Sequence, residues 1–92
     1  MSDISFAYVL GSDGKSGDKG SGGYRTYVGW TTDLDRRLAE HNAGTGARST
    51  RGRHWVLLYA ERCAKREEAM SREWRIKRDR RFRKTLWPLP PS

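Results

Sequence analysis

The sequence predicts an α+β fold in which a three-stranded antiparallel sheet is flanked by helices, with the element order β-β-α-β-α-α. Two observations lead to this prediction. Apolar residues alternate with a period of two in two segments near the N-terminus, which is typical of strands that bury one face. Further along the chain, apolar residues recur every three or four positions in two segments, which is typical of helices, and a short apolar run between them indicates a third strand.

The two N-terminal strands are expected to form a hairpin. In the first, four larger residues alternate with smaller ones and define the expected buried face: Ile4, Phe6, Tyr8 and Leu10. The second strand is expected at residues 24–30, where the pattern repeats. Residues 12–23 between them are rich in glycine and polar side chains, so we expect a flexible hairpin loop there. A phosphate-binding role for this loop is disfavoured because it lacks P-loop spacing.

The first helix follows the second strand and carries signals for its start and its end. Thr32 is the expected N-cap, acidic residues in the next turn favour the positive end of the helix dipole, and Gly44 is the expected C-cap. Leu34 and Leu38 lie four residues apart and mark the side of the helix that should pack on the sheet.

The second half of the chain supplies the remaining elements. A basic segment without periodicity at 44–53 predicts a loop, and the apolar run within 54–62 predicts a central strand. A second helix is expected at about 64–77, although no Ser, Thr or Asp precedes it as a cap. A further short helix is expected at 80–86, before the proline-rich tail at 88–92 ends regular structure.

The charge of the chain points to a polyanionic partner. The formal net charge is +8, and residues 65–92 hold ten basic against four acidic side chains. Nucleic acid is the expected partner. Two alternatives are a merely solubilising role for the charges, and an anionic membrane bound through the apolar side chains of the basic tail, which are Phe82, Leu86 and Trp87.

Length and composition exclude several classes of protein. With 92 residues the chain has room for one domain, expected at 1–87. No apolar run approaches the roughly 20 residues that span a bilayer, and the polar N-terminus does not resemble a signal peptide, so we expect a soluble, cytoplasmic protein. Cys63 is the one cysteine, which rules out a disulfide framework and a cysteine zinc site. Any metal must therefore be bound by oxygen ligands.

Glu73 is out of place in the second helix. Ala69, Met70, Trp74 and Ile76 are expected to form its apolar stripe, and Glu73 falls within it. An unpaired buried charge costs several kcal/mol, roughly, so such a residue is normally paired or bound to a cation. A salt bridge to arginine and a metal site are both open at this point.

Arg37 and His41 form a second unusual pair, on the first helix. They lie four residues apart, so their side chains project side by side near the apolar stripe and could face one site. The alternative is an ordinary solvated helix edge. Trp30 and Trp55 are expected to be core residues rather than stacking platforms.

These features together resemble the GIY-YIG nuclease family. Its two strand motifs correspond to Phe6-Ala7-Tyr8 and Tyr27-Val28-Gly29, its arginine and histidine to Arg37 and His41, and its glutamate to Glu73. The segment Gly-Thr-Gly-Ala-Arg-Ser-Thr-Arg, at 44–51, also recurs in the small, single-domain bacterial branch, the YhbQ-like proteins. The resemblance covers roughly residues 5–85, and it departs from the family where Phe6 replaces the first glycine.

The resemblance implies a divalent-metal-dependent endonuclease with a GIY-YIG fold that hydrolyses DNA phosphodiester bonds. Its catalytic residues would be Tyr8, Tyr27, Arg37, His41 and Glu73, with Glu73 as the ligand of Mg²⁺ or Mn²⁺. Tyr27 would be the general base and Tyr8 would orient the water or phosphate. His41 would accept the proton of Tyr27 or hold its hydroxyl, and Arg37 would bind the scissile phosphate.

The basic side chains that follow would bind the nucleic-acid backbone, which predicts structure-selective rather than sequence-specific cleavage. These side chains are Arg48, Arg51, Arg53, Lys77, Arg78, Arg80 and Arg81. RNA is a possible substrate besides DNA. The alternative function is a nucleic-acid-binding module with the same fold that does not cut, or that cuts only with a protein partner. The sequence leaves the pathway and the oligomeric state open.

Overall fold

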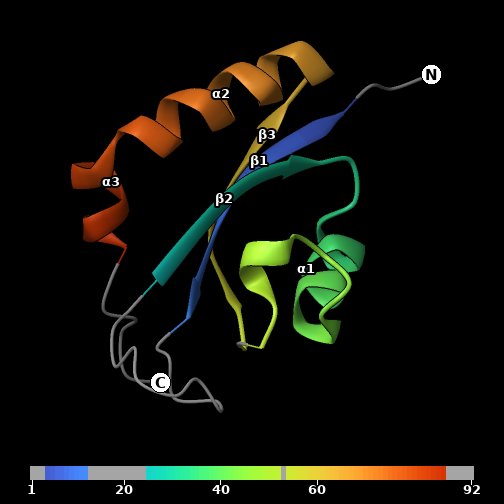
Figure 1. The fold of residues 1–92 in the computed structure, drawn as a ribbon. Helices are drawn as coiled ribbons and strands as arrows, with labels where there is room; N and C mark the ends of the chain where they lie inside the picture. The colour runs from blue at the N-terminus through green and yellow to red at the C-terminus, as the bar shows by residue number, and fades with distance from the viewer. Residues whose placement is uncertain (1–3, 13–24, 53, 87–92) are drawn as a thin grey trace.

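Three strands form one antiparallel sheet, as predicted, with β1 (Ser5–Ser12) between β2 (Arg25–Thr31) and β3 (Val56–Cys63) (Figure 1). The structure is a computed structural model that describes residues 4–12, 25–52 and 54–86. The predicted glycine-rich loop therefore lies outside the described residues apart from Ser12, and so does the proline-rich tail.

Two predictions about the sheet are wrong. The strand β3 was expected at the centre of the sheet but lies at one edge, and β1 is the central strand. β1 also buries both of its faces, because the smaller residues Ala7 and Val9 are as buried as Tyr8 and Leu10. The small residues of the alternating pattern are themselves apolar, so they pack beneath a second layer of helices instead of facing water.

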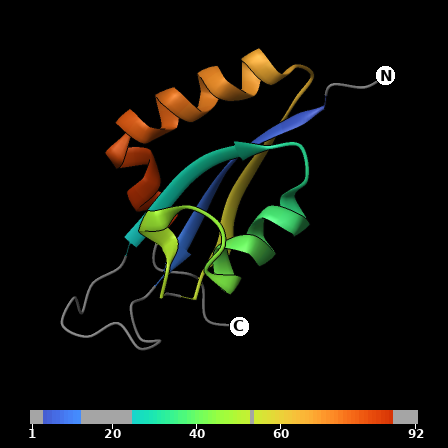
Figure 2. The ribbon, with the colours of Figure 1, turned by 45° about the vertical axis from the view of Figure 1, so that its right-hand side comes forward.

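The two faces of the sheet carry different helices (Figures 1 and 2). On one face, α1 (Leu34–Ala43) packs over a cluster built on Tyr8, Leu10 and Trp55. On the other face, α2 (Arg66–Arg78) and α3 (Arg80–Thr85) cover the second cluster. The buried members of that cluster are Ala7, Val9, Val28 and Ile76. The short helix predicted at 80–86 is thus confirmed.

The helix α1 begins one residue later than predicted. Asp33, not Thr32, is the N-cap, since its carboxylate accepts a hydrogen bond from the backbone N–H of Arg36 at 3.1 Å. Asp33 is itself held by Thr31, whose Oγ1 accepts from the Asp33 N–H at 3.1 Å. The predicted C-cap is confirmed, because Gly44 has φ 82°, a left-handed conformation that favours glycine.

The apolar stripe of α2 differs from the predicted one. Ala69 and Ile76 are buried, whereas Met70 and Trp74 are 46% and 58% exposed. Glu73 lies four residues after Ala69 and three before Ile76, so it shares their side of the helix. The N-cap residue, Lys65, makes no side-chain capping bond, as the sequence indicated.

A bidentate ion pair fixes α2 to the sheet. The guanidinium of Arg72 donates to the two carboxylate oxygens of Glu61 at 2.6 and 3.0 Å, and Tyr59 donates to the same carboxylate at 2.7 Å. These bonds, Arg72 first, hold the pKa of Glu61 below its ordinary value of 4.5. The pair therefore restrains the part of α2 that carries the next residue, Glu73.

We expect Glu61→Gln to lower the free energy of unfolding at pH 7 by about 1 kcal/mol, because solvent screens a pair that is roughly one-third exposed. A carboxyl with a lowered pKa stabilises the fold above its unfolded pKa and loses that effect as pH falls through its folded pKa. The variant should therefore lose less stability than wild type between pH 5 and pH 3, as measured by urea unfolding. Glu67→Gln, at an exposed site in α2, is the control, and equal acid sensitivity of Glu61→Gln and wild type would contradict this account.

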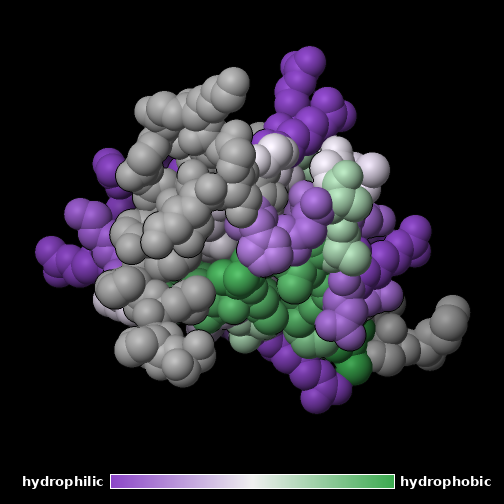
Figure 3. All heavy atoms as spheres, turned by 90° about the horizontal axis from the view of Figure 1, so that it is seen from below, coloured by the Kyte–Doolittle hydropathy of each residue, from purple (hydrophilic) through white to green (hydrophobic). Residues whose placement is uncertain are grey.

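The membrane alternative loses two of its three apolar anchors. Phe82 and Leu86 pack against the core cluster beneath α2 and α3, and Trp87 lies outside the described residues. Within the part of the chain that is described, no helix is long and apolar enough to cross a membrane. Seen from below, the molecule has hydrophilic side chains around a central hydrophobic area (Figure 3).

Candidate active site

A chain of hydrogen bonds links Tyr8, on the central strand, to the loop after α1. The Thr50 hydroxyl donates to the carbonyl oxygen of Ala47 at 2.8 Å, so its oxygen accepts from Nδ1 of His41, also at 2.8 Å. Nδ1 then carries the imidazole proton, which leaves Nε2 as an acceptor. The Tyr8 hydroxyl donates to Nε2 at 2.9 Å. The direction of every bond in the chain is therefore fixed.

Burial keeps both rings of this chain uncharged. Tyr8 is 1% and His41 0% exposed. Burial, reinforced by the positive charge of Arg37, lowers the pKa of His41 below its ordinary value. Burial also raises the pKa of Tyr8 to about 12; Arg37 opposes this rise, and the nearby negative charge of Glu73 adds slightly to it. At pH 7 a neutral phenol thus faces a neutral imidazole.

Two glycines leave the space that this pair occupies. A Cβ on Gly29, which lies opposite Tyr8 in the sheet, would stand 2.6 Å from the Tyr8 hydroxyl. A Cβ on Gly46 would stand 2.6 Å from His41 Nδ1 and 3.0 Å from its Cα. These contacts are too close for any larger residue unless the Tyr8 ring or, at Gly46, the His41 ring and backbone move. Gly29 was found by its motif, whereas Gly46 was not assigned a role.

The loop that carries Thr50 is fixed by two further residues that the sequence analysis missed as site residues. Trp55 Nε1 donates to the Thr50 carbonyl oxygen at 2.8 Å. Asn42 accepts from the Trp55 N–H at 2.6 Å and donates to its carbonyl oxygen at 3.0 Å. The core position predicted for Trp55 is confirmed, since it is 2% exposed. The motif at 44–51 was the available signal, but a motif alone does not reveal that Thr50 bonds to His41.

Tyr27 and Arg37 form the more accessible part of the site. The Tyr27 ring is partly exposed, and its centroid lies 4.7 Å from that of His41. The Arg37 side chain is 32% exposed and donates to Glu40 at 3.0 Å. This bond, followed by interactions with Tyr8 and Tyr27, raises the pKa of Arg37. His41 was expected to hold the Tyr27 hydroxyl, but its Nε2 instead accepts a hydrogen bond from Tyr8.

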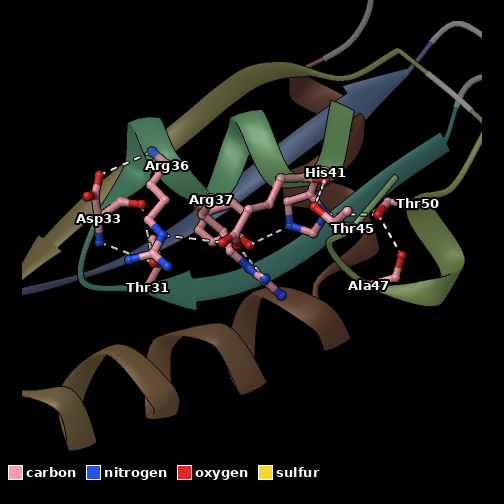
Figure 4. Close-up of polar contacts among 10 residues, drawn as sticks. Thr31, Asp33, Arg36, Arg37, His41, Thr45, Ala47 and Thr50 are labelled. Carbon is pink, nitrogen blue, oxygen red and sulfur yellow. Dashed lines mark hydrogen bonds and ion pairs between the residues drawn. The ribbon is translucent and has the colours of Figure 1, made fainter. Parts of the chain in front are cut away.

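A groove of about 380 Å³ runs beside these residues, where α1, the end of β2 and the start of α2 meet. Its lining consists of Trp30, Thr31, Thr32, Asp33, Arg36, Arg37, Glu40 and Arg66. Figure 4 shows Arg36 and Arg37 extending from α1 toward β2. Glu40 forms an ion pair with each of them. Arg36, which the sequence analysis did not place among the site residues, thus belongs to the groove.

Glu73 approaches the site from α2. Its side chain is 22% exposed, it pairs with Lys77 at 3.4 Å, and its charge acts on Tyr8. A single carboxylate of limited exposure fits Mg²⁺ or Mn²⁺, which bind hard oxygen atoms and keep several waters. Across the described segments, no three His, Cys, Asp or Glu residues gather as a zinc site would require. Lys77 is 56% exposed and can turn away, because surface ion pairs are weak.

The expected backbone-binding residues fall into two groups. Arg48 and Arg51 are exposed beside the short 3₁₀ helix Arg48–Thr50, next to α1. The others are exposed along the end of α2 and the start of α3, and are Lys77, Arg78, Arg80 and Arg81. Arg78 lies over the Trp74 ring at 4.5 Å. Arg53 lies outside the described residues.

Comparison with known proteins places this chain in a family. The sequence profile described as the GIY-YIG catalytic domain matches residues 20–86. Tyr27, Arg37, His41 and Glu73 lie within that range and Tyr8 precedes it.

Relatives with similar sequences come from archaea and bacteria. A UPF0213 protein of Halobacterium salinarum is 54% identical over 59 residues, which are 63% of this chain and 77% of the relative. One of Haloquadratum walsbyi is 41% identical over 78 residues, 84% of this chain and 78% of the relative. One of Streptococcus pneumoniae is 54% identical, and there the match spans 60% of the relative.

A solved structure is also similar. The solution NMR structure of a UPF0213 protein from Bacillus halodurans is 35% identical, with a TM-score of 0.44, over 90% of this chain and 81% of that one. The profile match and the identity to the Haloquadratum walsbyi protein lead to one conclusion. The chain belongs to the GIY-YIG nuclease family, among its small UPF0213 members.

Proposed function

We propose that this protein is a divalent-metal-dependent endonuclease that hydrolyses phosphodiester bonds in DNA. One observation carries the proposal. Arg37 lines an open groove and lies near Tyr27, whose ring packs on the buried hydrogen-bonded chain of Tyr8, His41 and Thr50. A cation and a phenol held this way beside a buried polar network are suited to binding a phosphodiester and activating the water that attacks it.

The five site residues divide by their exposure. Tyr27 and Arg37 are partly exposed, so we assign them contact with the substrate. Arg37 binds the scissile phosphate, and Tyr27, as a phenolate that has released its proton to solvent, takes a proton from the attacking water. Tyr8 and His41 are buried, so we assign them a positioning role. Their hydrogen bond holds the aromatic surface against which Tyr27 lies and keeps an uncharged partner beside Arg37.

Glu73 is the residue that would hold the metal. A bound divalent cation would supply positive charge to the phosphate oxygens and to the departing oxygen. Glu73 fits because its carboxylate is partly buried on the side of α2 that faces the sheet and the Arg72–Glu61 pair restrains the helix there. For a metal to bind, the Lys77 side chain must turn away from the Glu73 carboxylate.

The basic groups on either side of the sheet support binding through the phosphate backbone. Such contacts carry no sequence information, and binding through several of them weakens steeply with salt. We therefore propose structure-selective cleavage by one nuclease domain that acts in the cytoplasm, with RNA as a second possible substrate.

The proposal is tested by incubating the purified protein with labelled linear, nicked, flap, junction and single-stranded DNAs and matching RNAs. Each substrate is given Mg²⁺, Mn²⁺ or EDTA. We expect cleavage of at least one branched or single-stranded substrate with either metal, and none with EDTA. Binding without cleavage of any substrate would instead favour the alternative, a module that binds nucleic acid without cutting it or that needs a protein partner.

A further inference from the structure

We propose that the groove at the edge of β2 binds a single-stranded nucleotide segment, with Trp30 stacking on an unpaired base and Arg66 binding the adjoining phosphate. This inference rests on the proposed function, because it names the part of the substrate that lies next to the cleaved bond.

Trp30 lies in the groove although the sequence predicted it for the core. It pairs with Ala7 in the sheet, so it points to the same face as the helix α2. Because β2 is an edge strand, however, none of the strands in the described residues lies along its outer side. The indole is only partly buried, and the Arg66 guanidinium lies 5.9 Å from the ring centroid. An aromatic ring with an exposed cation over one face is a suitable platform for a nucleic-acid base once that cation turns to the adjoining phosphate.

The groove is continuous with the catalytic residues. Arg37, which we assign to the scissile phosphate, lines the same groove as Trp30 and Arg66. A strand held at Arg37 would therefore place a neighbouring nucleotide against Trp30. Figure 4 shows Arg36 next to Arg37 on this side of α1, which gives the groove a further phosphate-binding cation.

The charge of the groove fits a polyanion. Three guanidinium groups line it, from Arg36, Arg37 and Arg66, against the carboxylates of Asp33 and Glu40. Both carboxylates are already engaged, Asp33 as the cap of α1 and Glu40 in ion pairs with Arg36 and Arg37 at 3.4 and 3.0 Å. The guanidinium of Arg66 lies over the Trp30 ring instead of in an ion pair with either of these carboxylates. An indole ring stacks equally well on any base.

The size and chemistry of the groove favour an unpaired strand over a duplex. A volume of about 380 Å³ lies at the low end of the roughly 300–1,000 Å³ of small-molecule sites, which suits a nucleotide unit. The bases of a continuous duplex are stacked on one another and cannot reach a protein ring, whereas those of flaps, gaps and single strands can. Trp30 thereby gives the enzyme a preference for unpaired DNA or RNA without any contact to a base edge.

The binding experiment uses fluorescein-labelled oligomers of thymidylate and of uridylate, eight nucleotides long by design, with fluorescence anisotropy in EDTA. We expect Trp30→Leu and Arg66→Glu each to weaken binding roughly tenfold, while Trp30→Phe stays within about threefold of wild type. Arg75→Glu, an equal charge change at an exposed site of α2 outside the groove lining, should have clearly less effect than Arg66→Glu.

Arg66 is exposed, so Arg66→Glu keeps the test valid even where Trp30→Leu unfolds the chain. Equal binding by wild type and Trp30→Leu, or equal losses in Arg66→Glu and Arg75→Glu, would overturn the inference. Loss with one oligomer and not the other would assign the site to DNA or to RNA.

Cleavage assays separate this inference from the proposed function. If wild type cuts, Trp30→Leu should lose its preference for a flap over a nicked duplex, with a larger change in KM than in kcat. An unchanged preference would contradict the role of Trp30. If wild type cuts nothing, the proposed function fails, and the oligomer measurements still decide whether the groove binds a single strand.

Discussion

Tyr27→Phe is expected to lower the cleavage rate by roughly 10²- to 10⁴-fold, the usual effect of losing a general base, while leaving the protein folded. The Tyr27 ring packs against His41, and phenylalanine keeps that contact. Only the hydroxyl, which we place at the attacking water, is removed. The measurement is single-turnover cleavage of the best flap substrate, with circular dichroism melting as the folding check.

Tyr8→Phe is the matched comparison, because it removes a hydroxyl from the other tyrosine. Nε2 of His41 would then lie buried without its partner, which costs about 1–3 kcal/mol of stability. We therefore expect Tyr8→Phe to lower the melting temperature clearly and Tyr27→Phe to change it little. The opposite result would contradict these roles: Tyr8→Phe would be stable but cleave roughly 10⁴-fold more slowly, and Tyr27→Phe would remain active. Tyr8 would then be the general base and Tyr27 the positioning residue.

The comparison has a pH dependence whose sign follows from the lowered pKa of His41. His41 is harder to protonate in the folded protein than in the unfolded chain. The neutral ring therefore stabilises the fold above the unfolded pKa of about 6.5, and this stabilisation is lost as the pH falls below that value. A protonated His41 could no longer accept the Tyr8 hydrogen bond. The melting temperature of wild type should thus fall on acidification from pH 7, and that of Tyr8→Phe should fall less steeply.

Arg37→Ala is expected to lower kcat/KM by roughly 10²- to 10³-fold, as when a preorganised donor to a charged transition state is removed. Arg37→Lys should recover only part of this loss, because an ammonium keeps the charge but cannot form two parallel bonds to a phosphate. The measurement is steady-state cleavage of the same flap, with oligomer binding to separate affinity from chemistry.

Arg36→Ala is the control for this variant, since Arg36 also pairs with Glu40 and lines the groove. Its side chain is 77% exposed, against 32% for Arg37, and we assign it no contact with the scissile phosphate. An effect on kcat as large as that of Arg37→Ala would contradict the assignment of that phosphate to Arg37.

Much of the fold was predictable because it depends on local patterns. Strand alternation, the Gly44 cap and the helical spacing of Leu34 and Leu38 are properties of neighbouring residues, and each gave the correct element. The position of β1 at the centre of the sheet depends instead on which strands pair. Nothing in the apolar run of β3 distinguishes a central strand from an edge strand covered by a helix on one face.

The site was predictable in its residue types but not in its bonds. Family motifs selected Tyr8, Tyr27, Arg37 and His41, and the structure brings them into contact. The partner of His41 could not be chosen from the sequence, because both tyrosines lie on neighbouring strands within reach of one helix. Trp30 was misplaced because hydrophobicity favours the core, whereas its exposure follows from the position of β2 at the sheet edge.

The central claim is that Glu73 holds a divalent metal at a phosphodiester-cleaving site, and Glu73→Ala tests it most directly. The measurement is single-turnover cleavage of the best flap DNA at increasing Mg²⁺ and Mn²⁺, with anisotropy on the same DNA. Glu67→Ala, which removes an exposed carboxylate from the same helix, is the control and should keep its activity. We predict that Glu73→Ala binds the flap as wild type does but does not cut it at any metal concentration. Metal-dependent cleavage by Glu73→Ala at the wild-type rate would contradict the account.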